Sequence, residues 1–276
     1  MSQRFSICNE LLSNTDINRS FEIVSELGYR GIEIAPFTIS DDVRKISRKD
    51  REALRGLAAS NGLEIVGIHW VLVSPAGLHL THSDASTRER TKNYMADLIA
   101  FTADIGGHVI VLGSPKQRSI SKNVRKEDAW VFAKQILRYC CEEAERLDVL
   151  LCLEPLSRSL TNFINTAEEA MRMIEDVGLP NMRMTLDVYS MSDEEKSMHE
   201  IITRSAPFLA HFHANDTNGK APGMGNADYD SIARALKDID YKGFVSVEIF
   251  DRPRDPIETA SESIRNLRTY FWGGSR

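Results

Sequence analysis

The chain has 276 residues, of which 42% are hydrophobic and 27% are charged, and its formal net charge is −6. This is the composition of an ordinary globular protein with a large core, and the length suits two common domains or one α/β barrel of about 250 residues. The acidic balance gives no electrostatic reason to expect a nucleic-acid partner. No stretch approaches the roughly 18 apolar residues of a membrane span, so a membrane is not expected as a partner either.

The cysteine pattern favours a reducing compartment. The chain contains no C-x-x-C pair, and its four cysteines lie within strand-like or helical stretches, at Cys8, Cys140, Cys141 and Cys152. Buried free thiols are the expected state, because free cysteine behaves as a small apolar residue. The chain also begins without an apolar signal segment, and we expect a cytoplasmic protein.

Strand-like runs and amphipathic helical stretches alternate along the whole chain. The expected strands are 4–8, 31–34, 64–69, 108–112, 149–153, 182–186, 208–212 and 244–247. The expected helices are 16–27, 48–60, 86–105, 126–147, 166–177, 193–205, 229–239 and 256–271. Eight such units without a linker predict an α/β fold, a single (β/α)8 TIM barrel over residues 1–276. A doubly wound open sheet is the alternative, but it usually has fewer strands, and no G-x-G-x-x-G follows the first run.

Turn residues support these boundaries. A glycine that can close a helix in the left-handed conformation precedes five of the expected strands, at Gly28, Gly62, Gly106, Gly178 and Gly243. The expected helix N-caps are Asp16, Ser86 and Thr166.

Four side chains that commonly bind metals stand at the ends of the last four expected strands. They are Glu154, Asp187, His213 and Glu248. Because the strands of a parallel barrel all point the same way, their carboxyl ends gather at one rim, which is where barrel enzymes place their active sites. Three carboxylates and an imidazole gathered there need a cation to offset their charge.

This set of ligands is mostly hard oxygen donors, which suit Mn²⁺ or Mg²⁺ and tolerate Co²⁺ or Zn²⁺. The absence of cysteine from the set argues against a structural zinc site. Each residue alone is a weak signal, because a rim carboxylate or a core histidine is common. Four at consecutive strand ends predict one shared divalent metal ion.

The segments that carry these residues are Leu153-Glu154-Pro155, Leu186-Asp187, His211-Phe212-His213 with Asn215-Asp216, and Val247-Glu248. Taken in order, they resemble the xylose isomerase-like TIM-barrel superfamily. Within it they are most similar to the sugar (phosphate) isomerase/epimerase family that includes the D-tagatose and D-psicose 3-epimerases. The resemblance covers essentially the whole chain.

The resemblance implies one ion, usually Mn²⁺ in that family, bound by the four residues above, with Glu154 and Glu248 also acting as the acid/base catalysts. It implies an isomerase or epimerase that acts on a ketose, a keto-sugar or a sugar phosphate. One glutamate would remove a proton beside the carbonyl to give an enediolate, and the other would return a proton. Homo-oligomers are frequent in that family, so a homo-oligomer is an open expectation.

Other rim residues are candidates for sugar binding. Glu33 could orient a hydroxyl or a rim histidine, His69 and Trp70 could form a wall of the site, and Arg158 could hold a substrate oxygen or pair with a rim carboxylate. Lys116 and Arg118, in the loop after the fourth strand, could bind a phosphate or carboxylate, or could be solvated loop residues. His211 is expected one layer deeper than His213, in a packing or supporting position.

The chain departs from the ketose 3-epimerase pattern at three positions around the substrate. Ser190 stands where those enzymes carry a substrate-contacting histidine, and Leu160 stands where they carry a glutamate. Lys220 is the one cation near the position of their arginine, and a lysine does not reproduce a forked guanidinium. Free tagatose or psicose is therefore a doubtful natural substrate.

Three other functions stay open. An inosose-type dehydratase would begin with the same proton abstraction and then eject a hydroxyl, and a non-catalytic sugar- or metal-binding protein would keep the site without turnover. A phosphodiesterase resembling endonuclease IV would need a three-zinc cluster with several more histidines. The remaining histidines are not at the strand ends that such a cluster requires, and they are His79, His82, His108 and His199.

Overall fold

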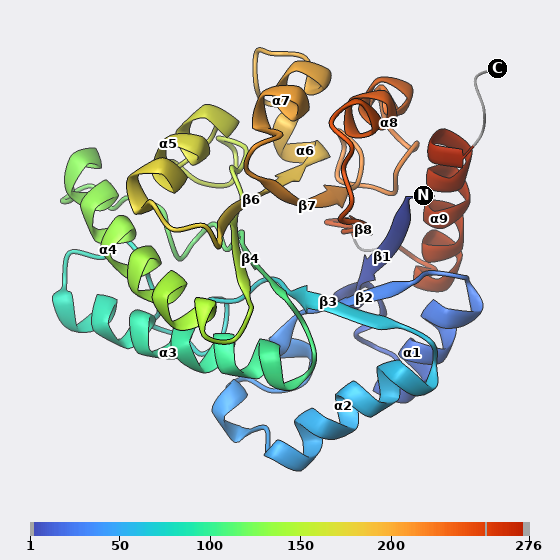
Figure 1. The fold of residues 1–276 in the computed structure, drawn as a ribbon, viewed down its shortest axis with the longest axis horizontal. Coiled ribbons are helices and arrows are strands. Elements are labelled where there is room, and N and C mark those ends of the chain that lie inside the picture. Colours follow the sequence, from blue (N-terminus) through green and yellow to red (C-terminus); the bar gives the residue numbers. More distant parts are fainter. Residues whose placement is uncertain (1–2, 252, 273–276) are drawn as a thin grey trace.

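The structure, a computed structural model, describes residues 3–251 and 253–272, so the ends of the predicted domain at 1–2 and 273–276 lie outside the described residues. Parallel strands form one closed barrel in chain order, with the first strand paired to the last (Figure 1). The strands are β1 (Arg4–Cys8), β2 (Gly31–Ile34), β3 (Glu64–Ile68), β4 (Val109–Leu112), β5 (Leu150–Leu153), β6 (Met182–Asp187), β7 (Leu209–Ala214) and β8 (Phe244–Val247). Closure confirms the predicted barrel and excludes the open sheet.

The helices surround the barrel (Figure 1). They are α1 (Ile17–Glu26), α2 (Arg48–Ser60), α3 (Ala85–Asp104), α4 (Lys126–Glu145), α5 (Ala167–Val177), α6 (Val188–Met191), α7 (Met198–Ser205), α8 (Tyr229–Asp238) and α9 (Pro256–Trp272). Short 3₁₀ turns η1 (Asn9–Leu12), η2 (Pro36–Thr38) and η3 (Val43–Lys45) follow β1 and β2. Across the described part of the chain, none of the helices has both the length and the apolar character needed to cross a bilayer.

Side-chain caps fix where the helices begin. Asp16 accepts hydrogen bonds from the backbone of α1 and Thr166 from that of α5, as predicted. The prediction of Ser86 as the cap of α3 is wrong, because Asp84 accepts from the backbone N–H groups of both Ser86 and Thr87. A carboxylate can serve two of the unpaired N–H groups of a first turn at once, and the helix therefore starts earlier than expected.

The helix expected at 193–205 is shorter, since it begins only at Met198 as α7, and a separate short helix, α6, precedes it at Val188–Met191. Asp187 ends β6 and accepts from the backbone N–H of Ser190, which starts α6 directly at the rim. Ser197 then caps α7 through the N–H of Glu200. The polar residues 192–197 form the connection, and the regular helical pattern begins only after this second cap.

Four of the five glycines expected to close helices have positive φ angles, and Gly178 ends α5 with φ +69°. Gly243 is the exception, since Asp240 with φ +55° reverses the chain after α8 instead. A Cβ atom at position 243 would lie 2.8 Å from the backbone oxygen of Ala210. Glycine is needed there for close approach and not for its φ angle.

The barrel interior carries polar side chains one step below the predicted ligands. Alternation along a strand places residues i and i−2 on one face, so Phe212 points away from His211 and His213 and joins the main apolar core. The interior residues two positions before the four predicted ligands are each at most 1% exposed, and they are Cys152, Thr185, His211 and Ser246. All four cysteines are free and buried, as expected. The charged side chains at the carboxyl ends of the strands therefore lie above a barrel interior from which solvent is excluded.

Candidate metal centre

The ends of β5 to β8 bring the four predicted ligands together. One donor atom from each of Glu154, Asp187, His213 and Glu248 lies within 4.8 Å of the donor atoms of the others. The four side chains are between 0% and 4% exposed. Nδ1 of His213 lies 2.9 Å from Oε2 of Glu248 and 3.3 Å from Oε1 of Glu154. The strand register thus places two glutamates beside the same imidazole nitrogen.

These residues fit a divalent cation. Oε1 of Glu154 and Nδ1 of His213 are buried and have no hydrogen-bond partner among the described residues. Buried polar atoms are normally paired, and an ion at the centre of the cluster would supply the missing partner. Three carboxylates and one imidazole form a donor set that matches Mn²⁺ or Mg²⁺ chemistry. The cluster is therefore able to hold a metal ion.

Asp187 is held from both of its oxygens. Oδ1 accepts the backbone N–H of Ser190 at 2.8 Å, and Oδ2 accepts the side-chain amide of Asn215 at 2.7 Å. The amide oxygen of Asn215 in turn accepts the N–H of Tyr189 at 2.8 Å. Asn215 follows β7 and belongs to the segment that carries the family resemblance, but no site role was predicted for it. It gives the carboxylate one orientation, which is the usual task of groups around a metal ligand.

The electrostatics of the cluster favour a cation. Burial, and after it the charges of Glu154 and Glu248, raises the pKa of Asp187 to about 8, and burial also raises the pKa of Glu154. Burial alone would lower the pKa of His213, but the carboxylates of Glu248 and Glu33 raise it well above its usual range. Without a bound cation, these raised pKa values favour the protonated forms of the three side chains. Metal binding should therefore release protons.

We expect the stability of the metal-free protein to fall as the pH rises from about 6 to 8. In this range folded Asp187, with a pKa of about 8, keeps a proton that the unfolded chain, with an ordinary value of 3.8, has lost. Stability falls with pH wherever the folded state binds more protons, by up to about 1.4 kcal/mol per pH unit for one proton. Urea unfolding of chelator-treated protein at pH 6, 7 and 8 measures this slope. Saturating Mn²⁺ should remove it, and a metal-free slope that is flat or rising would contradict the charge arrangement.

A second group of buried polar side chains lies behind His213. Glu33 of β2 is 0% exposed, and its carboxylate lies 2.8 Å from Nε2 of His211 and 3.1 Å from Nε2 of His213. Nδ1 of His69 is 3.5 Å from Glu33, and Nε2 of His69 is 2.6 Å from Glu10. Burial alone would raise the pKa of Glu33, but His211 and His213 hold it well below its usual range. The predicted residues Glu33 and His69 thus belong to this second group, behind the four-ligand cluster, and Glu10 was not predicted.

Gly113 makes room for the carboxylate of Glu154. A Cβ atom at position 113 would lie 1.9 Å from Oε2 of Glu154, far inside contact distance. We expect Gly113→Ala to displace this carboxylate and to lower kcat/KM by about 100-fold, the effect of an error of about 1 Å in catalytic geometry. Steady-state kinetics with a thermal melt checks this, and Gly56→Ala, where a Cβ meets nothing within 4 Å, is the matched control. Normal kinetics of Gly113→Ala would show that Glu154 does not need this space.

The other predicted substrate residues lie in different environments. Trp70 follows β3, is half-buried and has φ +53°, a strained conformation for a bulky residue that is frequent at functional sites. The guanidinium of Arg158 is exposed, donates to the backbone oxygen of Asp193 at 3.2 Å and lies 3.7 Å from its carboxylate. Arg158 thus makes the ion pair that was its alternative role.

The two basic residues after β4 do not converge. Lys116 is exposed, whereas Arg118 is 1% exposed and donates to the backbone oxygens of Leu112 and Ile164 at 3.2 and 3.4 Å. Burial lowers the pKa of Arg118 to about 10. The alternative of two solvated loop residues is wrong for Arg118, because the turn at 115–118 directs its side chain inward. The sequence shows the charge of this residue but not the direction of its side chain.

The positions that depart from the 3-epimerase pattern differ in burial. Ser190 is 3% exposed, and its hydroxyl has no hydrogen-bond partner among the described residues. Leu160 is 37% exposed, and Lys220 is exposed in the loop after β7. Two of the three positions therefore face outward at the rim, where a substrate or solvent can reach them.

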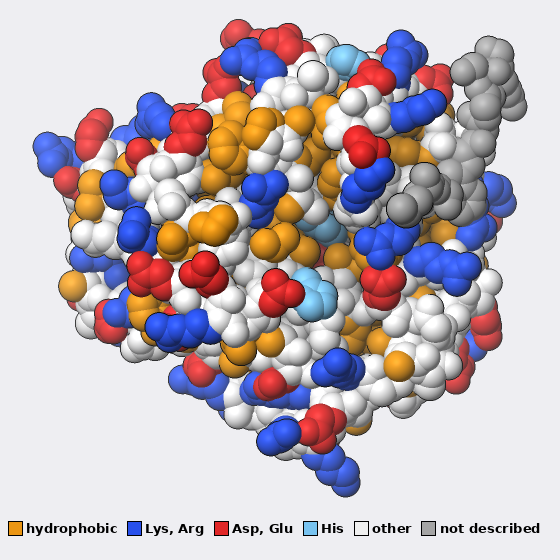
Figure 2. All heavy atoms as spheres, in the orientation of Figure 1, with side chains coloured by type: hydrophobic (Ala, Val, Ile, Leu, Met, Phe, Trp, Pro, Cys, Tyr) orange, Lys and Arg blue, Asp and Glu red, His pale blue; other side chains and the backbone are white. Residues whose placement is uncertain are grey.

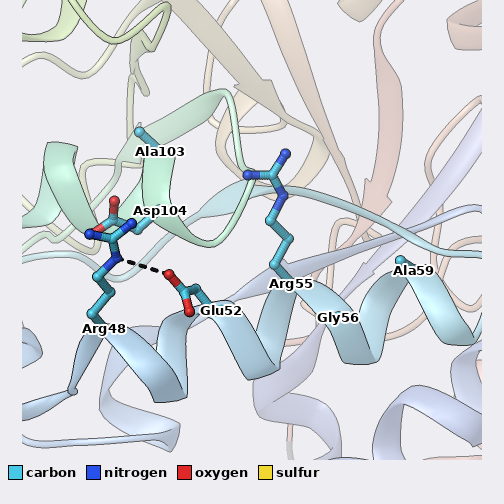
Figure 3. A pocket seen from close by; sticks show the side chains of 7 residues that line it. All are labelled: Arg48, Glu52, Arg55, Gly56, Ala59, Ala103 and Asp104. Carbon is cyan, nitrogen blue, oxygen red and sulfur yellow. Dashed lines mark hydrogen bonds and ion pairs between the residues drawn. The ribbon is translucent and has the colours of Figure 1, made fainter.

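A surface groove of about 520 Å³ lies on the outer wall, between α2 and the end of α3 (Figure 3). Its lining consists of Arg48, Glu52, Arg55, Gly56, Ala59, Ala103 and Asp104. None of these residues belongs to the cluster at the strand ends, so this groove is separate from the candidate metal centre. Figure 2 shows acidic and basic side chains interspersed over the visible face of the molecule.

Comparisons with known proteins agree with the fold. A family model described as xylose isomerase-like TIM barrel matches residues 21–270. D-psicose 3-epimerase from Agrobacterium fabrum is 29% identical over 249 residues, which cover 89% of this chain and 83% of that protein. D-psicose 3-epimerase from Ruminiclostridium cellulolyticum is 30% identical over 241 residues, which cover 86% and 79%.

Solved structures show the same fold. D-psicose 3-epimerase with D-tagatose from Clostridium cellulolyticum H10 has a TM-score of 0.87 at 24% identity and covers 98% of this chain and 99% of its own. A 3-keto-D-glucoside 4-epimerase from E. coli has a TM-score of 0.84 at 22% identity, with 97% and 99% covered. With the family model matching most of the sequence, the chain belongs to the xylose isomerase-like TIM-barrel family.

Proposed function

We propose that the chain is a divalent-metal-dependent sugar isomerase or epimerase that removes a proton from the carbon beside a carbonyl. The observation that carries the proposal is the buried cluster in which Glu154 and Glu248 both approach Nδ1 of His213 and Asp187 completes the donor set. The relatives named as D-psicose 3-epimerases, which match most of the chain, support the same class of reaction.

The four side chains of the cluster would hold one ion, and Mn²⁺ is the proposed metal, with Mg²⁺, Co²⁺ and Zn²⁺ as alternatives. Such an ion, when bound, polarises a substrate carbonyl and stabilises the negative charge of an enediolate. Asp187 and His213 have only this binding role in the proposal. Asp187 is suited to it because Ser190 and Asn215 fix both of its oxygens.

Glu154 and Glu248 have the acid/base role in the proposal. One glutamate accepts the proton from the substrate carbon, and the electron pair of the C–H bond moves into the enediolate. The other glutamate donates a proton to the same carbon from the opposite face, which gives the epimer, or to the adjacent carbon, which gives the isomer. Buried carboxylates with raised pKa values are suited to this task, as burial provides for Glu154.

A ketose or keto-sugar is the favoured substrate. Lys116 and Arg118 were the candidates for binding a substrate phosphate, and the guanidinium of Arg118 is instead buried against backbone oxygens. Trp70, at the end of β3, is proposed as a wall of the sugar site, and Arg158 and Lys220 as rim contacts. The four free cysteines support a proposed cytoplasmic location, and the homo-oligomer stays a proposal.

Solvent deuterium incorporation into a panel of ketoses, keto-sugars and sugar phosphates, read by mass, tests the proposal. Exchange of one carbon-bound hydrogen for deuterium, in a product otherwise of the same composition as the substrate, is expected for at least one unphosphorylated sugar. A product lighter by one water would replace the proposal with a dehydratase. Binding of sugars without exchange, with metal present, would replace it with a non-catalytic binding protein.

A further inference from the structure

The buried carboxylate of Glu33 contacts the predicted metal ligand His213 from the side opposite the cluster. Glu33 lies in β2, far in sequence from β7, and is completely buried. Its Oε1 is 3.1 Å from Nε2 of His213, and its Oε2 is 2.8 Å from Nε2 of His211. A buried carboxylate is stable only when its oxygens accept hydrogen bonds, and these two imidazoles provide them.

The two nitrogens of His213 face different groups. Nδ1 faces Glu154 and Glu248 at 3.3 and 2.9 Å, and Nε2 faces Glu33. A neutral imidazole carries one proton, and its other nitrogen can bind a metal only if that proton is on the far side of the ring. We infer that Glu33 is the positioning residue of the metal centre: it accepts the Nε2–H of His213 and so holds the Nδ1 lone pair toward the ion. This inference rests on the proposed metal site.

Glu33 is itself held in place by His211, and His69 lies close to it. His211, one step deeper in β7, contacts Oε2, which leaves Oε1 for His213. His69, 1% exposed at the end of β3, lies 3.5 Å from Oε1 through Nδ1 and 2.6 Å from Glu10 through Nε2. The first three strands contribute no residue to the four-ligand cluster. Of these strands, β2 supplies through Glu33 the carboxylate that contacts the imidazole of the cluster.

This arrangement assigns Glu33 a role different from direct substrate contact. Both oxygens of the carboxylate lie against imidazole nitrogens, and the side chain has no exposed surface. A supporting carboxylate of this kind typically changes metal affinity by about 10- to 100-fold, because it fixes the tautomer and raises the basicity of the ligand. Loss of Glu33 should therefore appear first in metal binding.

Titration calorimetry with Mn²⁺ alone, on the wild-type protein, Glu33→Gln and Glu22→Gln, tests the inference. Glu33→Gln should bind Mn²⁺ about 10- to 100-fold more weakly than wild type. Glu22→Gln should bind with unchanged affinity, because the exposed carboxylate of Glu22 pairs with Arg19 on α1. At saturating Mn²⁺, Glu33→Gln should recover much of its kcat, which a general loss of structure would not allow.

A second measurement uses the wild-type protein and does not depend on whether Glu33→Gln folds. In ¹⁵N-histidine-labelled wild-type protein loaded with Mg²⁺, the ring signals of His213, assigned by their loss in His213→Asn, should show the proton on Nε2. A proton on Nδ1 would overturn the inference, and so would an unchanged Mn²⁺ affinity of Glu33→Gln. Neither result would contradict the metal centre itself. No Mn²⁺ binding by wild-type protein overturns the metal centre and the inference together.

Discussion

Glu154→Gln and Glu248→Gln are each expected to abolish epimerisation, with losses of about 10²- to 10⁴-fold, while each keeps proton exchange with one of the two epimers. In a two-base mechanism each glutamate serves one face of the substrate carbon. A variant that lacks one base can still remove and return the proton on the other face. Deuterium exchange should therefore start from opposite epimers in the two variants.

These experiments must separate proton transfer from metal binding, because glutamine is also a weaker ligand than glutamate. Both variants are therefore assayed at saturating Mn²⁺, with the bound metal counted and the fold checked by thermal melting. Near-normal epimerisation by either variant would remove that residue from the acid/base role. Loss of exchange from both epimers at full metal occupancy would contradict the assignment of one base to each face.

Removal of divalent metal is expected to stop turnover completely and to lower stability. Without a cation, the buried carboxylates repel one another, and Asp187 has a pKa raised to about 8. An ion that binds only the folded state stabilises it by about 2.7 kcal/mol when its concentration is 100 times Kd. Chelator-treated protein should therefore melt at a lower temperature, and Mn²⁺ should restore activity better than Mg²⁺, Co²⁺ or Zn²⁺.

Asp187→Ala is the control for the metal effect on stability. This variant lacks one of the four donors, so Mn²⁺ should shift its melting temperature much less than that of wild type. A wild-type shift in Asp187→Ala would place the ion somewhere else. Full turnover by the metal-free wild-type protein would contradict a metal-dependent reaction.

The barrel and the cluster were predictable because both follow from strand periodicity. Parallel strands in a closed barrel all end at one rim, so a donor residue at each of four consecutive strand ends was enough to predict that Glu154, Asp187, His213 and Glu248 meet. Alternation along β7 also placed His211 below His213 correctly. These predictions depend on repeating local geometry, which a sequence records directly.

Features that depend on loop conformation were not predictable in this way. The inward turn of Arg118 and the contact between Glu10 and His69 depend on the paths of connections that have no periodic pattern. The space that Gly113 leaves for Glu154 depends on two neighbouring strands at atomic separation. The additional helix α6 and the late start of α7 follow from the caps at Asp187 and Ser197, whose side chains could equally face solvent in the sequence alone.

A crystal of the Mn²⁺-loaded protein, with anomalous diffraction recorded at the manganese absorption edge, tests the shared metal site most directly. The result expected is one strong anomalous peak within bonding distance of Glu154, Asp187, Nδ1 of His213 and Glu248. A peak away from these four side chains, or no peak in protein that turns over substrate, would contradict the account.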